Sequence, residues 1–217
     1  MKLKMNHPPM KHQVAALKKR DQRPKSPCDD DAFAWLMDMG TGKSYVLLME
    51  YLEYLQNNDE DFDLMVIAPA GSYQNWYVDK GPEPDDWCEL RKHLPPALLS
   101  KLKIMGWVSG GGRKYESELR EFLEHDGPRC FFVNVEALSS VDKARDASVK
   151  FLSRGRALLA HDESTSGKNP KAKRTKFLNQ KLAPMAPVRR ILTGLIAPKG
   201  PLDVYTQMKF FEPSILG

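Results

Sequence analysis

The sequence predicts an α/β fold in which helices cover both faces of a mostly parallel sheet. Short apolar runs alternate with segments of helical character along the 217 residues, and this alternation is typical of parallel sheets. Two motifs, one rich in glycine and one with paired carboxylates, directly follow two of the apolar runs. Ligands of such sheets bind beyond the carboxyl ends of the strands, so both motifs stand where a site is expected.

The predicted elements follow in a regular order. The first strand is Phe33–Met37, and the helix after it spans residues 44–56. Spacings of three and four residues put the apolar side chains of this helix on one face, namely Leu48, Tyr51, Leu52 and Leu55. Further strands are expected at residues 64–69 and near residues 104, 130, 157 and 190. Between them, a helix begins at Ser72, and others span residues 116–125, 142–152 and 171–180.

The string MGTGKS, residues 39–44, has the features of a phosphate-binding loop. Two glycines let the backbone curl with its N–H groups inward, at the start of a helix whose dipole favours negative charge. The Lys43 ammonium would bind the terminal phosphates, and the Ser44 hydroxyl would ligate magnesium. The full eight-residue pattern begins with glycine, and Met37 stands at that position here. The nucleotide-binding residues predicted in this loop are Met39, Gly40, Thr41, Gly42, Lys43 and Ser44.

The string HDES, residues 161–164, ends another apolar run and carries an acid pair. Asp162 is predicted to hold magnesium, directly or through water, and Glu163 to polarise the attacking water. Paired acids also often just begin a helix, where the dipole favours them, but a position directly at a strand end favours the ligand site. Glu163 and Lys43 are therefore the predicted catalytic residues. We expect His161 to pack or to hydrogen-bond locally.

Charge is unevenly distributed in this chain of net charge +5. Residues 1–20 contain six Lys or Arg without an acid, and residues 165–190 contain eight, again without an acid. Such segments suggest a side that faces a polyanion, although solvated surfaces are often simply rich in lysine. No apolar run approaches the roughly 20 residues of a membrane helix, and the first residues do not form a secretory signal. Three separated cysteines fit a reducing compartment, so we expect a cytoplasmic protein, or a nuclear one in a eukaryote.

Six strings in the sequence resemble, in order, the motifs of one protein family. PPMKHQVAAL resembles a glutamine motif that reads adenine, and LMDMGTGKS resembles motif I. VIAPAGSYQNWYVD resembles motif Ia, and FFVNVEAL resembles motif Ib. HDESTSGKNPKAKRTKFL resembles motif II with a Lys-Asn-Pro extension, and residues 189–213 resemble motif III and the segment after it. Over nearly all its residues, the chain thus resembles the first RecA-like lobe of helicase superfamily 2. It is most similar to the Swi/Snf-like branch of double-stranded DNA translocases, in a form similar to phage or bacterial members.

This resemblance implies a RecA-like P-loop NTPase lobe that binds ATP and magnesium, with Gln13 bonding the adenine. It also implies contacts to the backbone of double-stranded DNA from motifs Ia and Ib and from the Lys-Asn-Pro region. Such contacts follow phosphate charge without reading bases. The DNA-binding residues implied in this way are Pro69, Trp76, Asn134, Lys168, Asn169, Lys171, Lys173 and Arg174.

Two features depart from the family's pattern. Thr193 and Gly194, which the resemblance implies couple hydrolysis to DNA engagement, are followed by Leu195 instead of a hydroxyl residue. The family also completes its ATP site with arginines from a second RecA-like lobe, and residues 1–217 account for one lobe. We therefore expect the second lobe in cis or from a partner chain. Because such an arginine is worth orders of magnitude in rate, one lobe alone should be weakly active or inactive.

The sequence thus predicts the ATP-binding lobe of a DNA-dependent ATPase that translocates on double-stranded DNA. One alternative is a stand-alone module that binds ATP and DNA without appreciable turnover. Leu195 and the missing lobe favour this module, whereas the intact phosphate loop and acid pair count against it. A small-molecule kinase is a third interpretation, but the basic stretch after the acid pair suits a polymer better.

Overall fold

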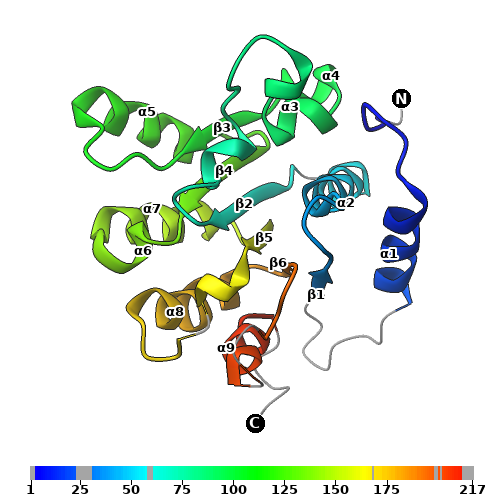
Figure 1. The fold of residues 1–217 in the computed structure, drawn as a ribbon. Helices are drawn as coiled ribbons and strands as arrows, with labels where there is room; N and C mark the ends of the chain where they lie inside the picture. Colours follow the sequence, from blue (N-terminus) through cyan, green and yellow to red (C-terminus); the bar gives the residue numbers. More distant parts are fainter. Residues whose placement is uncertain are drawn as a thin grey trace.

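The computed structural model describes residues 3–22, 31–57, 61–167, 169–197, 200 and 202–211. In this part of the chain, six parallel strands form one sheet in the order β1-β6-β5-β2-β4-β3. The strands are β1 (Asp31–Leu36), β2 (Asp63–Ala68), β3 (Lys103–Gly106), β4 (Arg129–Asn134), β5 (Ala157–Asp162) and β6 (Val188–Thr193). The sheet runs through the middle of the molecule with helices on both sides (Figure 1). The predicted α/β fold is therefore confirmed.

Helices fill the connections between these strands, and in the described part of the chain two further helices lie before β1 and after β6. They are α1 (Lys11–Asp21), α2 (Lys43–Asn57), α3 (Glu89–His93), α4 (Pro96–Leu99), α5 (Gly112–Glu124), α6 (Ala137–Ser140), α7 (Asp142–Leu152), α8 (Lys173–Phe177) and α9 (Leu202–Phe211). Single turns of other helix types are η1 (Tyr73–Trp76), η2 (Pro84–Asp86), η3 (Ser164–Gly167), η4 (Leu178–Leu182) and η5 (Ala183–Met185).

Two predicted helices are shorter than expected. The helix predicted from Ser72 is only the 3₁₀ turn η1, and the glycine and prolines that follow it at residues 81–84 do not support a longer helix. The helix predicted over residues 171–180 begins at Lys173, after Pro170, and gives way to the π-helical turn η4. Asn169 accepts from the Lys171 N–H with its side chain and from the Ala172 N–H with its carbonyl, so these residues form a turn ahead of the helix, which accounts for the late start.

Successive residues of each strand enter two separate cores, because side chains in a strand alternate between the faces of the sheet. On the α2 side, Leu64 and Val66 of β2 pack with Leu48 of α2. On the opposite side, Met65 and Ile67 belong to the core that α5, α7 and η4 complete. Burying one such side chain fully contributes about 1.5–3 kcal/mol, so both faces hold the sheet in place.

Buried charges add a second set of restraints at the edge of the sheet formed by β1 and β6. The guanidinium group of Arg190 on β6 donates from Nε to both carboxylate oxygens of Glu50, each at 2.9 Å, and from Nη1 to the Asp31 carbonyl at 2.6 Å. Trp35 also donates to Glu50 at 3.3 Å, and Arg20 of α1 lies 3.3 Å from the same carboxylate. Glu50 therefore joins α2 to α1, β1 and β6.

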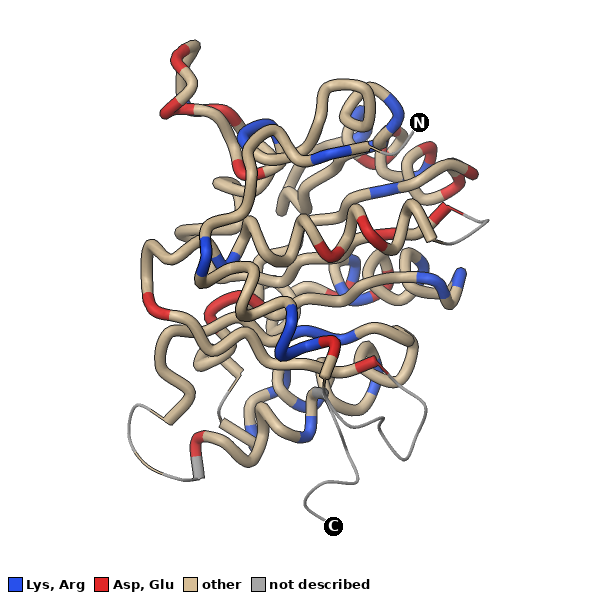
Figure 2. Tube along the Cα trace, turned by 90° about the vertical axis from the view of Figure 1, so that its right-hand side faces the viewer, with Lys and Arg blue, Asp and Glu red and all other residues tan. Residues whose placement is uncertain are grey.

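This network corrects part of the charge interpretation. Arg189 and Arg190, counted in the basic run of residues 165–190, are 2% and 0% exposed. Arg20, counted in the first basic run, is also buried. Their guanidinium groups bind carboxylates and carbonyls inside the protein, so they do not face a polyanion. Viewed from the side of α1, basic and acidic residues are interspersed along the chain (Figure 2). Within the described residues, no helix is long and apolar enough to cross a membrane.

Replacing the central carboxylate should destabilise the fold strongly. In a Glu50→Gln variant, the buried guanidinium of Arg190 loses its main charged partner, and breaking a buried pair from one side costs about 3–5 kcal/mol. We expect a loss of this size in the free energy of unfolding measured by urea titration. Glu116→Gln, which removes an exposed partner of Lys143, is the control and should leave the urea midpoint unchanged. Equal midpoints for both variants would contradict this role of Glu50.

Candidate nucleotide site and nucleic-acid interface

The strand order brings the two predicted halves of the site to one edge of the sheet. β6 pairs with β1 on one side and with β5 on the other. The loop after β1, the acid pair at the end of β5 and the segment after β6 therefore lie at neighbouring carboxyl ends. This edge is where parallel sheets bind ligands.

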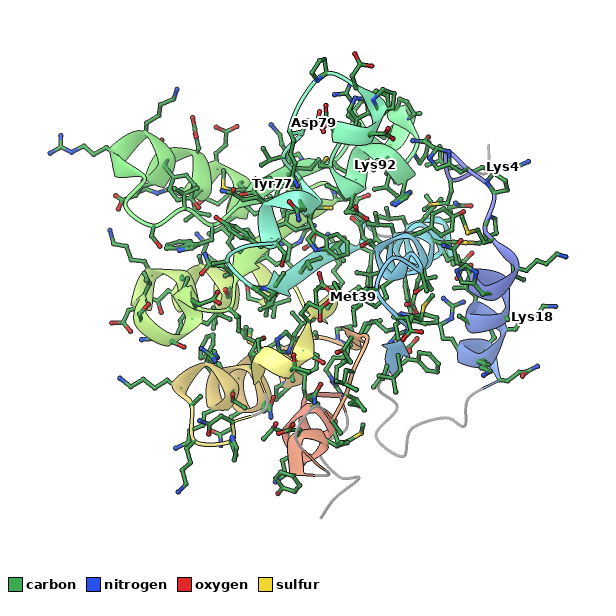
Figure 3. All side chains as sticks on the ribbon, in the orientation of Figure 1. Lys4, Lys18, Met39, Tyr77, Asp79 and Lys92 are labelled. Atoms are coloured by element: carbon green, nitrogen blue, oxygen red, sulfur yellow. The ribbon has the colours of Figure 1, made fainter. Side chains whose placement is uncertain are left out.

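The phosphate loop has the backbone shape that its glycines predict. Gly40 and Gly42 have φ angles of 76° and 82°, values that favour glycine because a side chain would clash with the backbone. The Lys43 ammonium donates to the carbonyls of Met37 and Asp38, at 3.2 and 3.3 Å. Met39 is 84% exposed and lies on the loop between β1 and α2 (Figure 3). Thr41 closes the loop by donating from its hydroxyl to the Asp38 carbonyl at 2.7 Å.

Gln13 lies against this loop rather than at a distance from it. Its Nε2 donates to the Thr41 carbonyl at 3.3 Å, and its Oε1 accepts from the Met10 N–H at 2.8 Å. A Cβ atom added to Gly42 would come within 2.3 Å of this Nε2. The side chain is 5% exposed. Gln13 therefore positions the phosphate loop, and glycine at position 42 leaves room for its amide.

Glu89 is a residue of this region that sequence reasoning missed. Burial alone would raise the pKa of its carboxyl, but hydrogen bonds from His93 and from the Ser44 hydroxyl outweigh burial and lower the pKa. The hydroxyl of the predicted magnesium ligand Ser44 thus helps to keep a carboxylate of α3 ionised. In the sequence, Glu89 follows an acidic stretch that is typical of a solvated surface. Only its tertiary contact with α2 distinguishes it from those surface acids.

Asp162 is an enclosed carboxylate at the end of β5. Its Oδ2 accepts from the Trp76 indole at 3.1 Å, and its Oδ1 accepts from the Glu163 N–H at 3.0 Å. Burial raises the pKa of Asp162 to about 6, while the Trp76 hydrogen bond and the charge of Lys43 oppose this rise. Since β1 and β5 both pair with β6, the loop that carries Lys43 and the carboxylate of Asp162 lie at nearby strand ends.

Glu163 adopts a backbone conformation that is rare for a residue with a side chain. Its φ angle is 46°, and it is the one non-glycine residue with positive φ among the described residues. Such conformations cost about 1–3 kcal/mol and cluster at functional sites. His161, next to the pair, packs as expected: its Nε2 lies 2.9 Å from the Ser166 hydroxyl, and burial lowers its pKa to about 4. It is therefore neutral at pH 7.

The structure assigns Trp76 a different role from the predicted DNA contact. The indole is 1% exposed, stacks on Phe132 with ring centroids 6.3 Å apart, and donates to Asp162. A buried ring is not accessible to a polymer. Trp76 instead holds the carboxylate of the acid pair.

The other predicted DNA-binding residues follow three neighbouring strands at the same edge. Pro69 follows β2, and its carbonyl starts the η1 turn by accepting from Ser72 and Tyr73. Asn134 ends β4 and caps α6 by accepting from the Ala137 N–H at 2.8 Å. The Lys-Asn-Pro region follows β5, and Lys168 lies outside the described residues.

Beyond this point the basic side chains are mostly exposed. Asn169 accepts from the Lys171 N–H at 3.0 Å and so forms a turn. Arg174 is half-buried and donates to the Ser166 carbonyl at 3.0 Å. Lys171 and Lys173 are exposed. Lys173 lines a groove of about 990 Å³ between α7 and α8, together with Arg145, Lys150, Lys176 and Lys181.

Thr193 and Gly194 lie between the two halves of the site. The Thr193 carbonyl accepts from the Met37 N–H at 3.2 Å, just before the phosphate loop. A Cβ atom added to Gly194 would lie 3.5 Å from the Met37 carbonyl. Leu195 is 60% exposed. The segment after β6 therefore contacts the start of the phosphate loop directly.

These features define the fold as a RecA-like α/β lobe. Over its whole length, the chain is similar to a Sulfolobus solfataricus SWI2/SNF2 ATPase core in complex with dsDNA, with a TM-score of 0.67 and 18% sequence identity. The chain spans 38% of the length of that ATPase core. No family model and no curated protein matches the sequence. The likeness establishes the fold, which confirms the predicted RecA-like lobe.

The environment of Asp162 predicts how it titrates. Trp76→Phe removes a hydrogen bond that stabilises the carboxylate, so the pKa of Asp162 should rise above its value of about 6. Carboxyl ¹³C NMR titration measures this shift directly. Trp87→Phe, whose indole binds the Pro82 carbonyl far from the acid pair, is the matched control. An unchanged or lower pKa in Trp76→Phe would show that the indole does not stabilise the carboxylate.

The same shift fixes the sign of a pH effect on stability. The pKa of Asp162 in the folded chain lies above the ordinary value of 3.8, so the folded chain binds more protons between pH 4 and 6. The contribution of Asp162 to the free energy of unfolding is therefore lost as pH rises through this window.

Proposed function

We propose that this chain is the ATP-binding lobe of a DNA-dependent ATPase that moves along double-stranded DNA. The observation that carries the proposal is the placement of the glycine loop with Lys43 and of the acid pair with Asp162 at the carboxyl ends of β1 and β5, the two strands that pair with β6. A lysine on a glycine loop and a carboxylate at a neighbouring strand end are the two halves of a magnesium–nucleotide site.

The residues at this edge fit a magnesium–triphosphate ligand. Among the described residues, the backbone N–H groups of Gly42, Lys43 and Ser44 have no hydrogen-bond partner at the start of α2. These donors suit phosphate oxygens. Asp162 is an enclosed carboxylate whose raised pKa a bound cation would lower. Bound magnesium would neutralise charge on the phosphates, and the residues that would hold it are Ser44 and Asp162.

Each residue has a distinct role in this proposal. Lys43 leaves the carbonyls of Met37 and Asp38 and binds the terminal phosphates. Glu163 orients and polarises the attacking water. Gln13 bonds the adenine while its amide remains against the loop. Ser44 would hold the magnesium ion through its hydroxyl, together with Asp162.

A DNA backbone is the proposed partner of the adjoining surface. Pro69, Asn134 and the basic residues after the acid pair follow strands that end at the same edge as the nucleotide site. Lys171 and Lys173 are exposed, and the α7–α8 groove continues the basic surface with further lysines. Exposed lysines bind phosphates without selecting a base sequence. The solved ATPase core that this chain resembles was determined in complex with dsDNA.

A second RecA-like lobe, in cis or from a partner chain, is proposed to complete the site. The chain corresponds to 38% of the similar ATPase core. An arginine supplied across the cleft contributes several orders of magnitude in rate to comparable nucleotide hydrolases. The 217-residue chain on its own should therefore bind nucleotide weakly and hydrolyse it slowly.

A module that binds ATP and DNA without turnover is the second candidate. The specific observation that favours it is the exposed Leu195, which gives the segment after β6 no side-chain hydroxyl next to Thr193 and Gly194. The intact acid pair favours the ATPase.

Removing the loop lysine separates these candidates. Lys43→Ala should weaken magnesium–ATP binding about tenfold or more, because a hydrogen bond to a charged group contributes about 1.5–3 kcal/mol. In the ATPase, ATP should also change the affinity of the wild-type chain for a DNA duplex, and the variant should lose this change. Fluorescence anisotropy of a labelled duplex, with and without magnesium–ATP, measures both effects.

Lys18→Ala serves as the control, because Lys18 is exposed on α1, away from the loop (Figure 3). DNA affinity that is indifferent to ATP and to Lys43→Ala would favour the passive module. ATP turnover by the 217-residue chain at the rate of complete translocases would contradict the need for a second lobe.

A further inference from the structure

A buried amide of α9 joins the acid-pair segment to the segment after β6. The side chain of Gln207 is 2% exposed. Its Nε2 donates to the Ile196 carbonyl and to the Asp203 carbonyl, each at 2.7 Å, and its Oε1 accepts from the Ser164 hydroxyl. Carbonyl oxygens only accept, so the two of them fix the NH₂ group on their side. The oxygen of the amide must then face Ser164.

Ser164 is placed where it can control the acid pair. It is fully buried, directly follows Glu163 and begins the η3 turn, in which the Glu163 carbonyl accepts from the Ser166 N–H at 3.0 Å. The left-handed backbone of Glu163 persists only if its surroundings hold it. The hydrogen bond between Ser164 and Gln207 is such a restraint.

The other end of the link reaches the phosphate loop. Ile196 belongs to the segment that begins with Thr193, whose carbonyl accepts from Met37 and whose hydroxyl oxygen accepts from the Leu195 N–H at 3.2 Å. Gly194 lies against Met37 and Met39. A continuous path therefore runs from the phosphate loop through residues 193–196 to Gln207 and on to Ser164.

Gln207 links the segment after β6 to the acid-pair segment, a link for which Leu195 has no side-chain hydroxyl. The Leu195 side chain is exposed and has no polar atom with which to bind the acid pair. Gln207 is twelve residues further along the sequence and comes from another element, α9. Its amide is long enough to contact both segments from the same buried position.

We propose that Gln207 is a positioning residue that transmits the nucleotide-bound state of the phosphate loop to the acid pair through Ser164. The proposal rests on the proposed function, because the signal is the binding of a magnesium nucleotide. Gln207 itself touches neither nucleotide nor metal. It acts by holding the backbone of Ser164, and with it Glu163, in register with the segment after β6.

Hydrogen exchange of the 217-residue chain tests this transmission. The probe is a non-hydrolysable ATP analogue with magnesium, and exchange is followed at residues 38–45, 164–167, 194–197 and 202–207. In the wild-type chain, the analogue should slow exchange in all four segments, by about fivefold or more where the segments are coupled. In Gln207→Leu, which keeps the volume and removes the polar atoms, residues 38–45 should remain protected. Residues 164–167 and 202–207 should lose their protection, whereas residues 194–197, which follow the loop contacts of Thr193 and Gly194, should keep theirs.

Two further variants separate transmission from a merely structural role. Ser164→Ala removes the same hydrogen bond from its other end, so it should reproduce the loss of protection at residues 164–167, and the double variant should add nothing there. It also serves if Gln207→Leu does not fold. Asn179→Leu is the matched control: Asn179 ties α9 to η4 by donating to the Thr206 carbonyl at 2.9 Å, away from the acid pair. It should keep the protection of all four segments.

The outcomes distinguish a failure of the proposed nucleotide binding from a failure of the role proposed for Gln207. No protection of residues 38–45 in the wild-type chain would overturn the proposed function and, with it, this inference. Protection of residues 38–45 without protection of residues 164–167 in the wild-type chain would overturn the inference alone. Retained protection of residues 164–167 in both Gln207→Leu and Ser164→Ala would also overturn it.

Discussion

Strand β6 can lie between β1 and β5 only because the guanidinium group of Arg190 is neutralised inside the protein. Glu50 of α2 does this, since both of its carboxylate oxygens accept from Arg190. A cation in a buried strand would otherwise carry a desolvation cost of several kcal/mol. With the pair in place, β6 presents Thr193 and Gly194 between the phosphate loop and the acid pair. The same contact anchors α2, whose first residues form that loop.

The charged and polar side chains of the candidate site already have hydrogen-bond or charged partners within the protein. Lys43 donates to the carbonyls of Met37 and Asp38, the Ser44 hydroxyl stabilises the charge of Glu89, and Asp162 accepts from the Trp76 indole. Each arrangement satisfies a charged or polar group that a ligand would otherwise bind. A magnesium nucleotide would take over these contacts, and the segments that now provide them would be released or drawn in. Binding at the loop thereby has physical routes to α3, to η1 and to the segment after β6.

Local patterns in the sequence predict the parts of this structure that depend on neighbouring residues. The strands were predictable because each is a short apolar run, and the loop because positive φ at Gly40 and Gly42 requires glycine. Trp76 was misassigned because its burial depends on Phe132 and Asp162, which are far from it in the sequence although their strands lie beside it in the fold. Arg190 was counted as a surface charge because its partner Glu50 is 140 residues away. Glu89 and Gln207 carry no sequence signal, since only tertiary packing brings them to Ser44 and Ser164.

The most direct test of the central claim asks whether the phosphate loop and the acid pair hold one magnesium ion. Calorimetric titration of magnesium–ATP into the wild-type chain, Ser44→Ala, Asp162→Asn and the double variant forms a double-mutant cycle. If both residues serve one ion, the two losses of binding free energy should be strongly non-additive, because either substitution already disrupts the shared site. Additive losses, or magnesium-independent binding of ATP by the wild-type chain, would contradict the claim that they form a single site.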